Sequence, residues 1–209
     1  MIYNDGKAGF LTTIIGPMFS EKSGELVKRC LLAQKYQGKQ VVVFKPSLDN
    51  RYAEDEVVSR IGLRIGAFRL HRDLAKIDPR AEVFERCAQA DLVAFDEAQF
   101  FSWELVPIVK RLLREGRQVL VAGLNLDYLG RPFGAIDRLL LFSDEVEVKA
   151  AFCACCGRPA MYTQRLIGGV PVTSLENPEE IVLIGDTESY EPRCRLCYQS
   201  GDPDAALYR

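Results

Sequence analysis

The apolar residues of the first 123 positions fall into short runs separated by amphipathic segments. Four runs, at residues 10–15, 40–44, 92–95 and 118–122, are rich in Val, Ile, Leu or Phe and are too short to be helices. Continuous apolar runs of this length are typical of strands buried on both faces of a parallel sheet. The pattern therefore predicts four buried strands in one sheet.

Helical periodicity separates these runs. Residues 25–35 carry apolar side chains at three- and four-residue spacing with charged residues between them. Residues 105–112 repeat that spacing before Gly116, which suits the C-terminus of a helix. Strands that alternate with helices predict a layered α/β domain with right-handed crossovers.

The character of the sequence changes after residue 148. Cys, Gly and Pro become frequent and the helical patterns stop, so we expect a small, loop-rich lobe over residues 153–198, followed by a polar tail. We place a domain boundary here, with residues 1–148 forming the α/β domain and residues 149–209 forming the lobe and the tail.

Composition narrows the functional classes. The chain has 209 residues, of which 48% are hydrophobic, so it can build an ordinary packed core. Lys and Arg number 27 and Asp and Glu 29, and this balance argues against a protein that coats DNA or RNA. No apolar run approaches the roughly 18 residues of a membrane span, and we expect no secretory signal at the N-terminus.

A candidate phosphate-binding loop joins the first predicted strand to the first predicted helix. Its sequence is Gly16-Pro17-Met18-Phe19-Ser20-Glu21-Lys22-Ser23, which matches the P-loop pattern G-x-x-x-x-G-K-[ST] except at Glu21. Such a loop directs backbone N–H groups at a polyphosphate. Lys22 is expected to reach the β- and γ-phosphates, and the Ser23 hydroxyl to bind Mg²⁺. The alternative is a strand-to-helix turn that merely contains Gly and Lys.

Glu21 is the departure from the P-loop pattern. Its side chain adds bulk and negative charge where the backbone should approach phosphate oxygens, and a positive φ at a non-Gly residue costs roughly 1 kcal/mol. We therefore expect weaker ATP binding and slower turnover than a glycine at this position would allow.

Two acidic residues end the third predicted strand. Asp96 and Glu97 directly follow residues 92–95, and ligands of open parallel sheets bind at the carboxyl ends of the strands. Asp96 stands where P-loop enzymes place the acid that holds Mg²⁺, and Glu97 could accept a proton from an attacking hydroxyl. The alternative is an acid pair that begins the helix predicted at residues 103–114. The upstream Lys-Ser loop favours the active-site interpretation.

A further pair of charged residues follows the second predicted strand. Asp49 could contact a ligand, and Arg51 could supply a cation for a transferring phosphoryl group. Taken singly, the Asp-Asn-Arg sequence also makes a common turn, and that interpretation remains open.

Five of the seven cysteines lie in two tight groups. Cys153 with Cys156, and Cys194 with Cys197, form two C-x-x-C pairs whose sulfurs can reach one tetrahedral ion. We expect a structural Zn²⁺ held by these four thiolates, with Cys155 as a bystander. The alternatives are a redox dithiol or unligated cysteines. The apolar run and polar loop between the pairs could fold over a ligand as a lid, or form a solvent-facing hairpin.

In this order, the motifs resemble those of the cellular (type II) thymidine kinases. The matching stretches are residues 14–20, 22–23, 49–52, 59–62, 96–101, 123–124, 132–134, 162–166, 184–190 and 194–198. The resemblance extends over about residues 10–198. Its specificity comes from the Asp-Glu-Ala-Gln-Phe-Phe run combined with the two cysteine pairs.

The resemblance implies an α/β fold: a P-loop parallel sheet with flanking helices, plus a small zinc-ribbon-like lobe with a lasso loop. Members of the family transfer the γ-phosphate of ATP to the 5′-hydroxyl of thymidine with Mg²⁺. It further implies that residues 16–23 bind ATP together with Asp96, Glu97, Ala98 and Gln99, and that Ser23 and Asp96 hold Mg²⁺. The implied catalytic residues are Glu97, Arg51 and Lys22.

The same resemblance implies a nucleoside site. Asp49 and Arg51 match positions at the sugar and the transferring phosphate, and residues 183–190 match a lasso loop whose backbone binds the base. The implied contacts of the nucleoside are Met18, Asp49, Phe100, Leu124, Tyr128, Phe133, Thr163, Leu183, Ile184, Gly185 and Tyr190. Phe101 is expected in the core instead. The four paired cysteines match zinc ligands, and family members are usually cytoplasmic homotetramers inhibited by thymidine triphosphate.

Three functional hypotheses remain. The first is a thymidine kinase of nucleotide salvage, weakened by Glu21, with deoxyuridine as a second acceptor that the sequence does not rank. The second is a pseudoenzyme of the same fold that binds nucleoside or nucleotide. The third is a zinc-knuckle nucleic-acid-binding module, which the balanced charge and the lack of a basic, aromatic stripe disfavour.

Overall fold

A six-stranded parallel sheet forms the centre of the computed structural model, which describes residues 8–47, 55–174 and 189–201. The strand order is β5-β2-β6-β7-β1-β8, with β1 between β7 and β8. The strands are β1 (Phe10–Ile15), β2 (Val41–Pro46), β5 (Phe68–Leu70), β6 (Leu92–Phe95), β7 (Gln118–Gly123) and β8 (Glu145–Val148). The predicted α/β class with a parallel sheet is confirmed.

The four predicted strands are the four central ones, and the two edge strands were not predicted. β8 has the sequence Glu-Val-Glu-Val, and Val146 and Val148 remain 44% and 54% exposed. β5 has only three residues. An edge strand pairs with one neighbour only, and one of its faces is less covered by other elements, so it needs no continuous apolar run.

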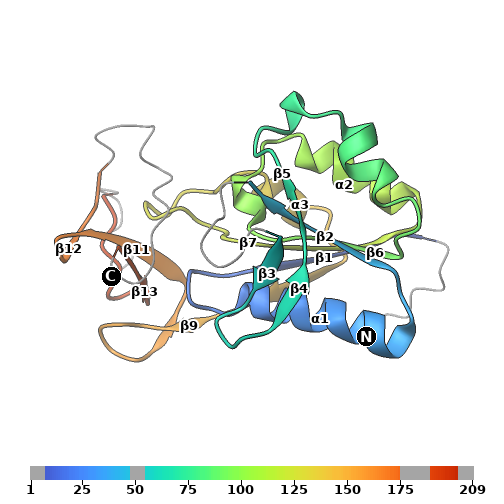
Figure 1. Cartoon of the computed structure of the whole chain (residues 1–209). Coiled ribbons are helices and arrows are strands. Elements are labelled where there is room, and N and C mark those ends of the chain that lie inside the picture. Colours follow the sequence, from blue (N-terminus) through green and yellow to red (C-terminus); the bar gives the residue numbers. More distant parts are fainter. Residues whose placement is uncertain (1–7, 48–54, 175–188, 202–209) are drawn as a thin grey trace.

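Helices cover both faces of the sheet, as Figure 1 shows. α1 (Lys22–Gln37) lies on one face together with the hairpin of β3 (Glu56–Val58) and β4 (Arg64–Gly66). The opposite face packs against α2 (Leu105–Arg114), α3 (Ile136–Leu140) and the short helical segments η1 (Leu74–Lys76) and η2 (Arg80–Glu85). A third short segment, η3 (Ala98–Phe100), follows β6. None of the helices among the described residues could span a membrane.

Two apolar clusters follow from the alternation of side chains along the central strands. Ile14 and Leu120 point into the cluster under α1, whereas Leu11 and Val121 point into the cluster under α2. α2 ends at Arg114, just before the predicted terminating residue Gly116. The φ of Gly116 is +81°, its N–H donates to the carbonyl of Leu113, and the N–H of Arg117 donates to that of Leu112. Phe101 is 2% exposed, which confirms its expected place in the core.

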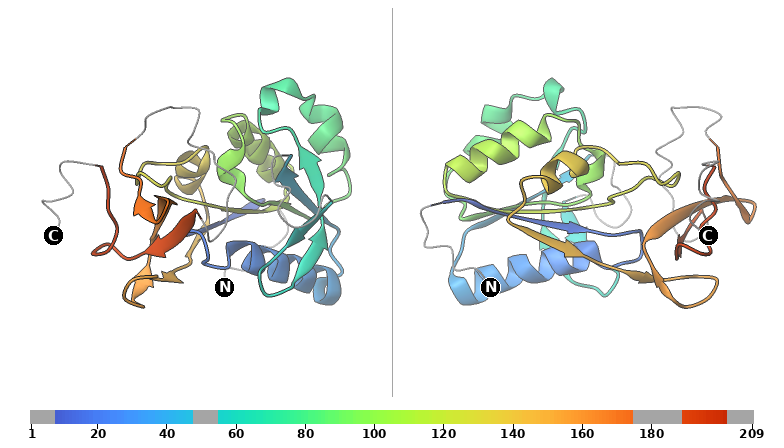
Figure 2. Two further views of the ribbon diagram at one scale, coloured as in Figure 1. Left: turned by 60° about the vertical axis from the view of Figure 1, so that its left-hand side comes forward. Right: turned by 180° about the vertical axis from the view of Figure 1, so that it is seen from behind.

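The lobe extends from one end of the sheet, as both views of Figure 2 show. It contains the antiparallel pairs β9 (Ala151–Phe152) with β10 (Pro159–Ala160), and β11 (Tyr162–Ile167) with β12 (Val170–Pro171) and β13 (Tyr190–Arg193). Among the described residues of the lobe, the buried apolar cluster consists of four small side chains: Ala151, Cys153, Ala160 and Cys194. Such a small core explains why the lobe needs a stabilising element other than apolar burial.

Candidate active site

The candidate phosphate loop, residues 16–23, connects the carboxyl end of β1 to α1. Inside the loop, the carbonyl oxygen of Pro17 accepts hydrogen bonds from Ser20 Oγ at 2.8 Å and from Lys22 Nζ at 2.6 Å. Lys22 is only 8% exposed. The loop thus holds its lysine against its own backbone, at the N-terminus of a helix, where anions are favoured.

Glu21 adopts the left-handed conformation, in which the sequence analysis assigns a non-Gly residue a cost. Its φ and ψ are 58° and 34°, and a non-Gly residue there carries strain of roughly 1–2 kcal/mol. The side chain turns back onto the first turn of α1. Its Oε2 lies so close to Gly24 that a Cβ added there would be 2.6 Å from it. Among the described residues this buried oxygen has no hydrogen-bond partner. Gly24 therefore leaves the space that the carboxylate occupies.

A hydrogen bond joins the loop to the first acid after β6. Ser23 Oγ donates to Asp96 Oδ1 at 3.0 Å, although the two residues are 73 positions apart, and Asp96 is 3% exposed. Hydroxyl and carboxylate oxygens are the hard ligands that Mg²⁺ prefers. This pair therefore fits a magnesium ion that would accompany a nucleotide in the loop.

The second acid, Glu97, is held by Gln99. Glu97 has φ 47° and ψ 42°, and its Oε2 accepts a hydrogen bond from Gln99 Nε2 at 2.5 Å. The Oε1 atom of the same Gln99 side chain accepts a hydrogen bond at 3.0 Å from the N–H of Leu124, which lies just beyond β7. Gly134 allows this packing, because its φ is +62° and a Cβ there would lie 2.2 Å from the carbonyl oxygen of Gln99. The sequence indicated Gln99 as an ATP-site residue and did not reveal this bridge.

Four predicted nucleoside contacts meet in two pairs. The N–H of Met18 donates to Thr163 Oγ1 at 3.0 Å, which ties the loop to β11. The rings of Phe100 and Phe133 meet edge to face with centroids 5.7 Å apart. These pairs bring together residues that lie far apart in the sequence.

Two further predicted contacts are buried beside β11. The carbonyl of Tyr128 accepts from the hydroxyl of Tyr198 at 2.8 Å, and Tyr190 pairs with Arg165 across β13 and β11. The remaining predicted residues lie outside the described residues: Asp49, Arg51, Leu183, Ile184 and Gly185.

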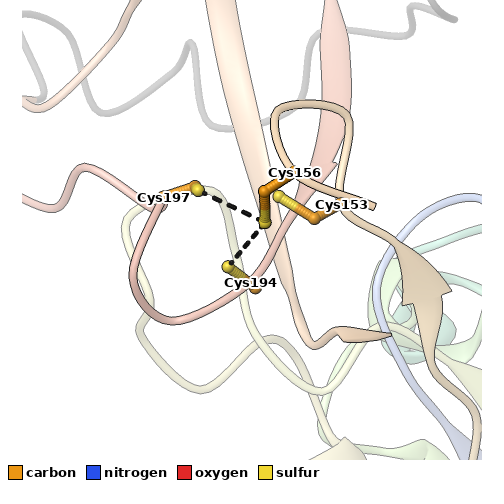
Figure 3. Close-up of side chains that lie close together, drawn as sticks. All are labelled: Cys153, Cys156, Cys194 and Cys197. Atoms are coloured by element: carbon orange, nitrogen blue, oxygen red, sulfur yellow. Dashed lines mark hydrogen bonds between the residues drawn. The ribbon is translucent and has the colours of Figure 1, made fainter. Parts of the chain in front are cut away.

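The four paired cysteines converge in the lobe, where their loops face each other (Figure 3). All four Sγ atoms lie within 4.8 Å of one another, with Cys156 at 3.6 Å from Cys194 and 3.7 Å from Cys197. Four thiolates bound to one tetrahedral zinc ion at about 2.3 Å stand about 3.8 Å apart. The cluster thus fits a structural Zn²⁺. Cys155 is exposed and lies outside the cluster, as expected.

The sequence model of the thymidine kinase family matches residues 9–198, which is most of the chain. The protein belongs to the thymidine kinase family. Membership in this family supports phosphorylation of thymidine, with a nucleoside and ATP as the small-molecule substrates. The four-cysteine cluster agrees with a zinc site in such a protein.

In this member of the thymidine kinase family, the local electrostatics prepare the cysteine cluster for a cation. Burial opposes ionisation of Cys153, but backbone N–H groups of Cys194, Cys155 and Cys156 lower the pKa of its thiol to about 6. The pKa of Cys197 is raised most by its hydrogen bond with Cys194, and the other nearby sulfurs raise it further. A metal ion bound by these four sulfurs would displace the protons of the thiols.

The structure also defines the contacts of two basic residues of this family member to which the sequence analysis assigned no role. Lys45 is the last residue but one of β2, is 2% exposed, and donates from Nζ to the carbonyl of Glu56 at 2.9 Å. Arg60, at the tip of the β3–β4 hairpin, stacks its guanidinium 4.3 Å from the centroid of the Phe19 ring. A lysine at the carboxyl end of an apolar strand was a signal that could have identified the first of these.

Proposed function

We propose that this protein is a thymidine kinase that transfers the γ-phosphate of ATP to the 5′-hydroxyl of thymidine. The observation that carries this proposal is the junction of the phosphate loop with the acids after β6. Ser23 reaches Asp96 at 3.0 Å, and Glu97 is the next residue along the chain. A nucleotide donor bound in the loop and Glu97 as general base would then lie at one edge of the sheet.

Residues 16–23 would bind the triphosphate of ATP. The backbone N–H groups of the loop and the N-terminus of α1 favour an anion there. Lys22 would exchange the carbonyl of Pro17 for phosphate oxygens, since both are acceptors for its ammonium group. Ala98 and Gln99 would border the same site beyond Asp96.

Ser23 and Asp96 would hold Mg²⁺, which neutralises charge that develops on the phosphate oxygens when it is bound. Glu97 would accept the proton of the 5′-hydroxyl. Gln99 supports that role because its amide group, anchored on Leu124, keeps the Glu97 carboxylate in one orientation. Arg51, outside the described residues, would supply a cation to the transferring group.

The base of the nucleoside would lie against the aromatic pair of Phe100 and Phe133. Phe100 and Phe133 offer a ring face and a ring edge, and Thr163 lies where the loop meets the lobe. Asp49 would contact the sugar, and Leu183, Ile184 and Gly185 would contact the base through their backbone. A site of this kind would accept thymidine and, to an extent that assays must rank, deoxyuridine.

The test is the transfer of labelled phosphate from Mg·ATP to thymidine by the full chain. Replacing Glu97 with Gln should lower kcat by about 10²–10⁴-fold, because a general base contributes on that order, while the Kd of thymidine stays unchanged. Glu104→Gln, an exposed glutamate before α2, is the matched control. A Glu97→Gln enzyme that keeps the wild-type rate would remove Glu97 from the mechanism.

A second candidate function is nucleoside or nucleotide binding without efficient transfer. The strained Glu21 and its buried oxygen favour it, because both lie inside the loop that would hold ATP. Saturable binding of thymidine without turnover, in the wild type and in Glu21→Gly alike, would support this second function. We further expect a cytoplasmic homotetramer inhibited by thymidine triphosphate, which sedimentation and inhibition assays would test.

A further inference from the structure

Phe19 lies in the phosphate loop in a conformation that its side chain disfavours. Its φ is +65°, and it is one of three non-Gly residues with positive φ among the described residues. Bulky residues adopt this region only where the surroundings require it. The contacts of its ring therefore identify what keeps the loop in this shape.

The Phe19 ring packs against the lobe that carries the cysteine cluster. It lies on the small apolar cluster of the lobe, which consists of Ala151, Cys153, Ala160 and Cys194. The guanidinium of Arg60 stacks on the ring at 4.3 Å from its centroid. The loop is thus connected through one side chain to the lobe and to the β3–β4 hairpin.

A second contact between loop and lobe lies one residue earlier. The N–H of Met18 donates to Thr163 Oγ1, and Thr163 pairs with Pro192 in β13, two residues before Cys194. Two of the four side chains in the apolar cluster of the lobe are themselves members of the four-cysteine site. The surface that supports Phe19 therefore depends on the arrangement of these thiols.

We propose that Phe19 is a positioning residue through which the four-cysteine site holds the phosphate loop in its anion-binding shape. A zinc ion in that site would keep Cys153 and Cys194 in place under the ring. The loop amides would then stay directed at a polyphosphate before it arrives, which saves the cost of ordering them on binding. This inference rests on the proposed function only for the identity of the ligand, ATP.

The test begins with the zinc-loaded full chain carrying Phe19→Ala. We expect an ATP Kd at least tenfold weaker by calorimetry, a smaller change for thymidine, and faster amide hydrogen exchange at residues 18–23, with unchanged zinc content. Phe19→Leu should recover most of the affinity because it keeps an apolar contact. Phe152→Ala is the matched control, since Phe152 belongs to the same lobe but is 79% exposed.

Chelation tests the link to the metal. Removing zinc from the wild type should speed exchange at residues 18–23, whereas in Phe19→Ala the exchange is already fast and chelation should add nothing. Equal acceleration by chelation in both proteins, or protected amides in loaded Phe19→Ala, would overturn the proposal. If chelation also speeds amide exchange in β7 and α2, the domain as a whole has loosened. The comparison of zinc-loaded wild type with zinc-loaded Phe19→Ala then decides the proposal. Because exchange is measured without nucleotide, a wild type that fails to bind ATP would refute the proposed function and leave this test intact.

Discussion

Replacing Glu21 with Gly should stabilise the protein and strengthen its use of ATP. Glycine removes strain of about 1–2 kcal/mol at φ +58°, and its greater freedom in the unfolded chain offsets about 0.5–1 kcal/mol of that gain. The change also removes a buried carboxylate oxygen that lacks a hydrogen-bond partner among the described residues. Burying this oxygen destabilises the wild type by about 1 kcal/mol.

The expected net gain is about 1–2.5 kcal/mol, which corresponds to a rise in Tm of about 2–10 °C for a chain of this size. Calorimetric melting of the wild type, Glu21→Ala and Glu21→Gly separates the two contributions, because Ala removes the carboxylate and retains the strain. We expect Tm to rise in that order, and kcat/KM for ATP to be highest in Glu21→Gly.

One result would refute this reasoning. A Glu21→Gly protein that melts at or below the wild-type temperature would mean that the left-handed backbone and the buried oxygen together cost no more than the conformational freedom that glycine adds to the unfolded chain. Equal kcat/KM for ATP in the two proteins would separately dismiss the view that Glu21 hinders the phosphates.

Two other predictions concern the neighbours of these sites. Gly24→Ala should lower Tm in the wild type, because the new Cβ would lie 2.6 Å from Glu21 Oε2. In the Glu21→Gly background the same substitution should raise Tm, because Ala gains about 1 kcal/mol of helix propensity over Gly. An equal change of Tm in both backgrounds would contradict the contact. Cys194→Ser should abolish zinc binding and lower Tm, whereas Cys155→Ser should retain the metal, as elemental analysis and melting would report. Loss of zinc in Cys155→Ser would place that thiol among the ligands.

The central architecture could be read from local patterns because those patterns reflect burial. A strand covered on both faces favours apolar residues at most of its positions, so β1, β2, β6 and β7 were visible as short runs rich in apolar residues. The paired cysteines were visible because two residues between thiols suit one metal ion. The edge strand β8 was missed, since partial exposure allows glutamate and valine to alternate along it.

The geometry of the candidate site was decided by contacts between distant segments. No local pattern reveals that Gln99 spans Glu97 and Leu124, or that Phe19 rests on the lobe. The sequence showed that Glu21 breaks the loop pattern, but the tertiary structure decided that its carboxylate turns onto Gly24. Spacing along the chain determines which chemical groups are available, whereas the packing of elements far apart in the sequence determines which of those groups meet.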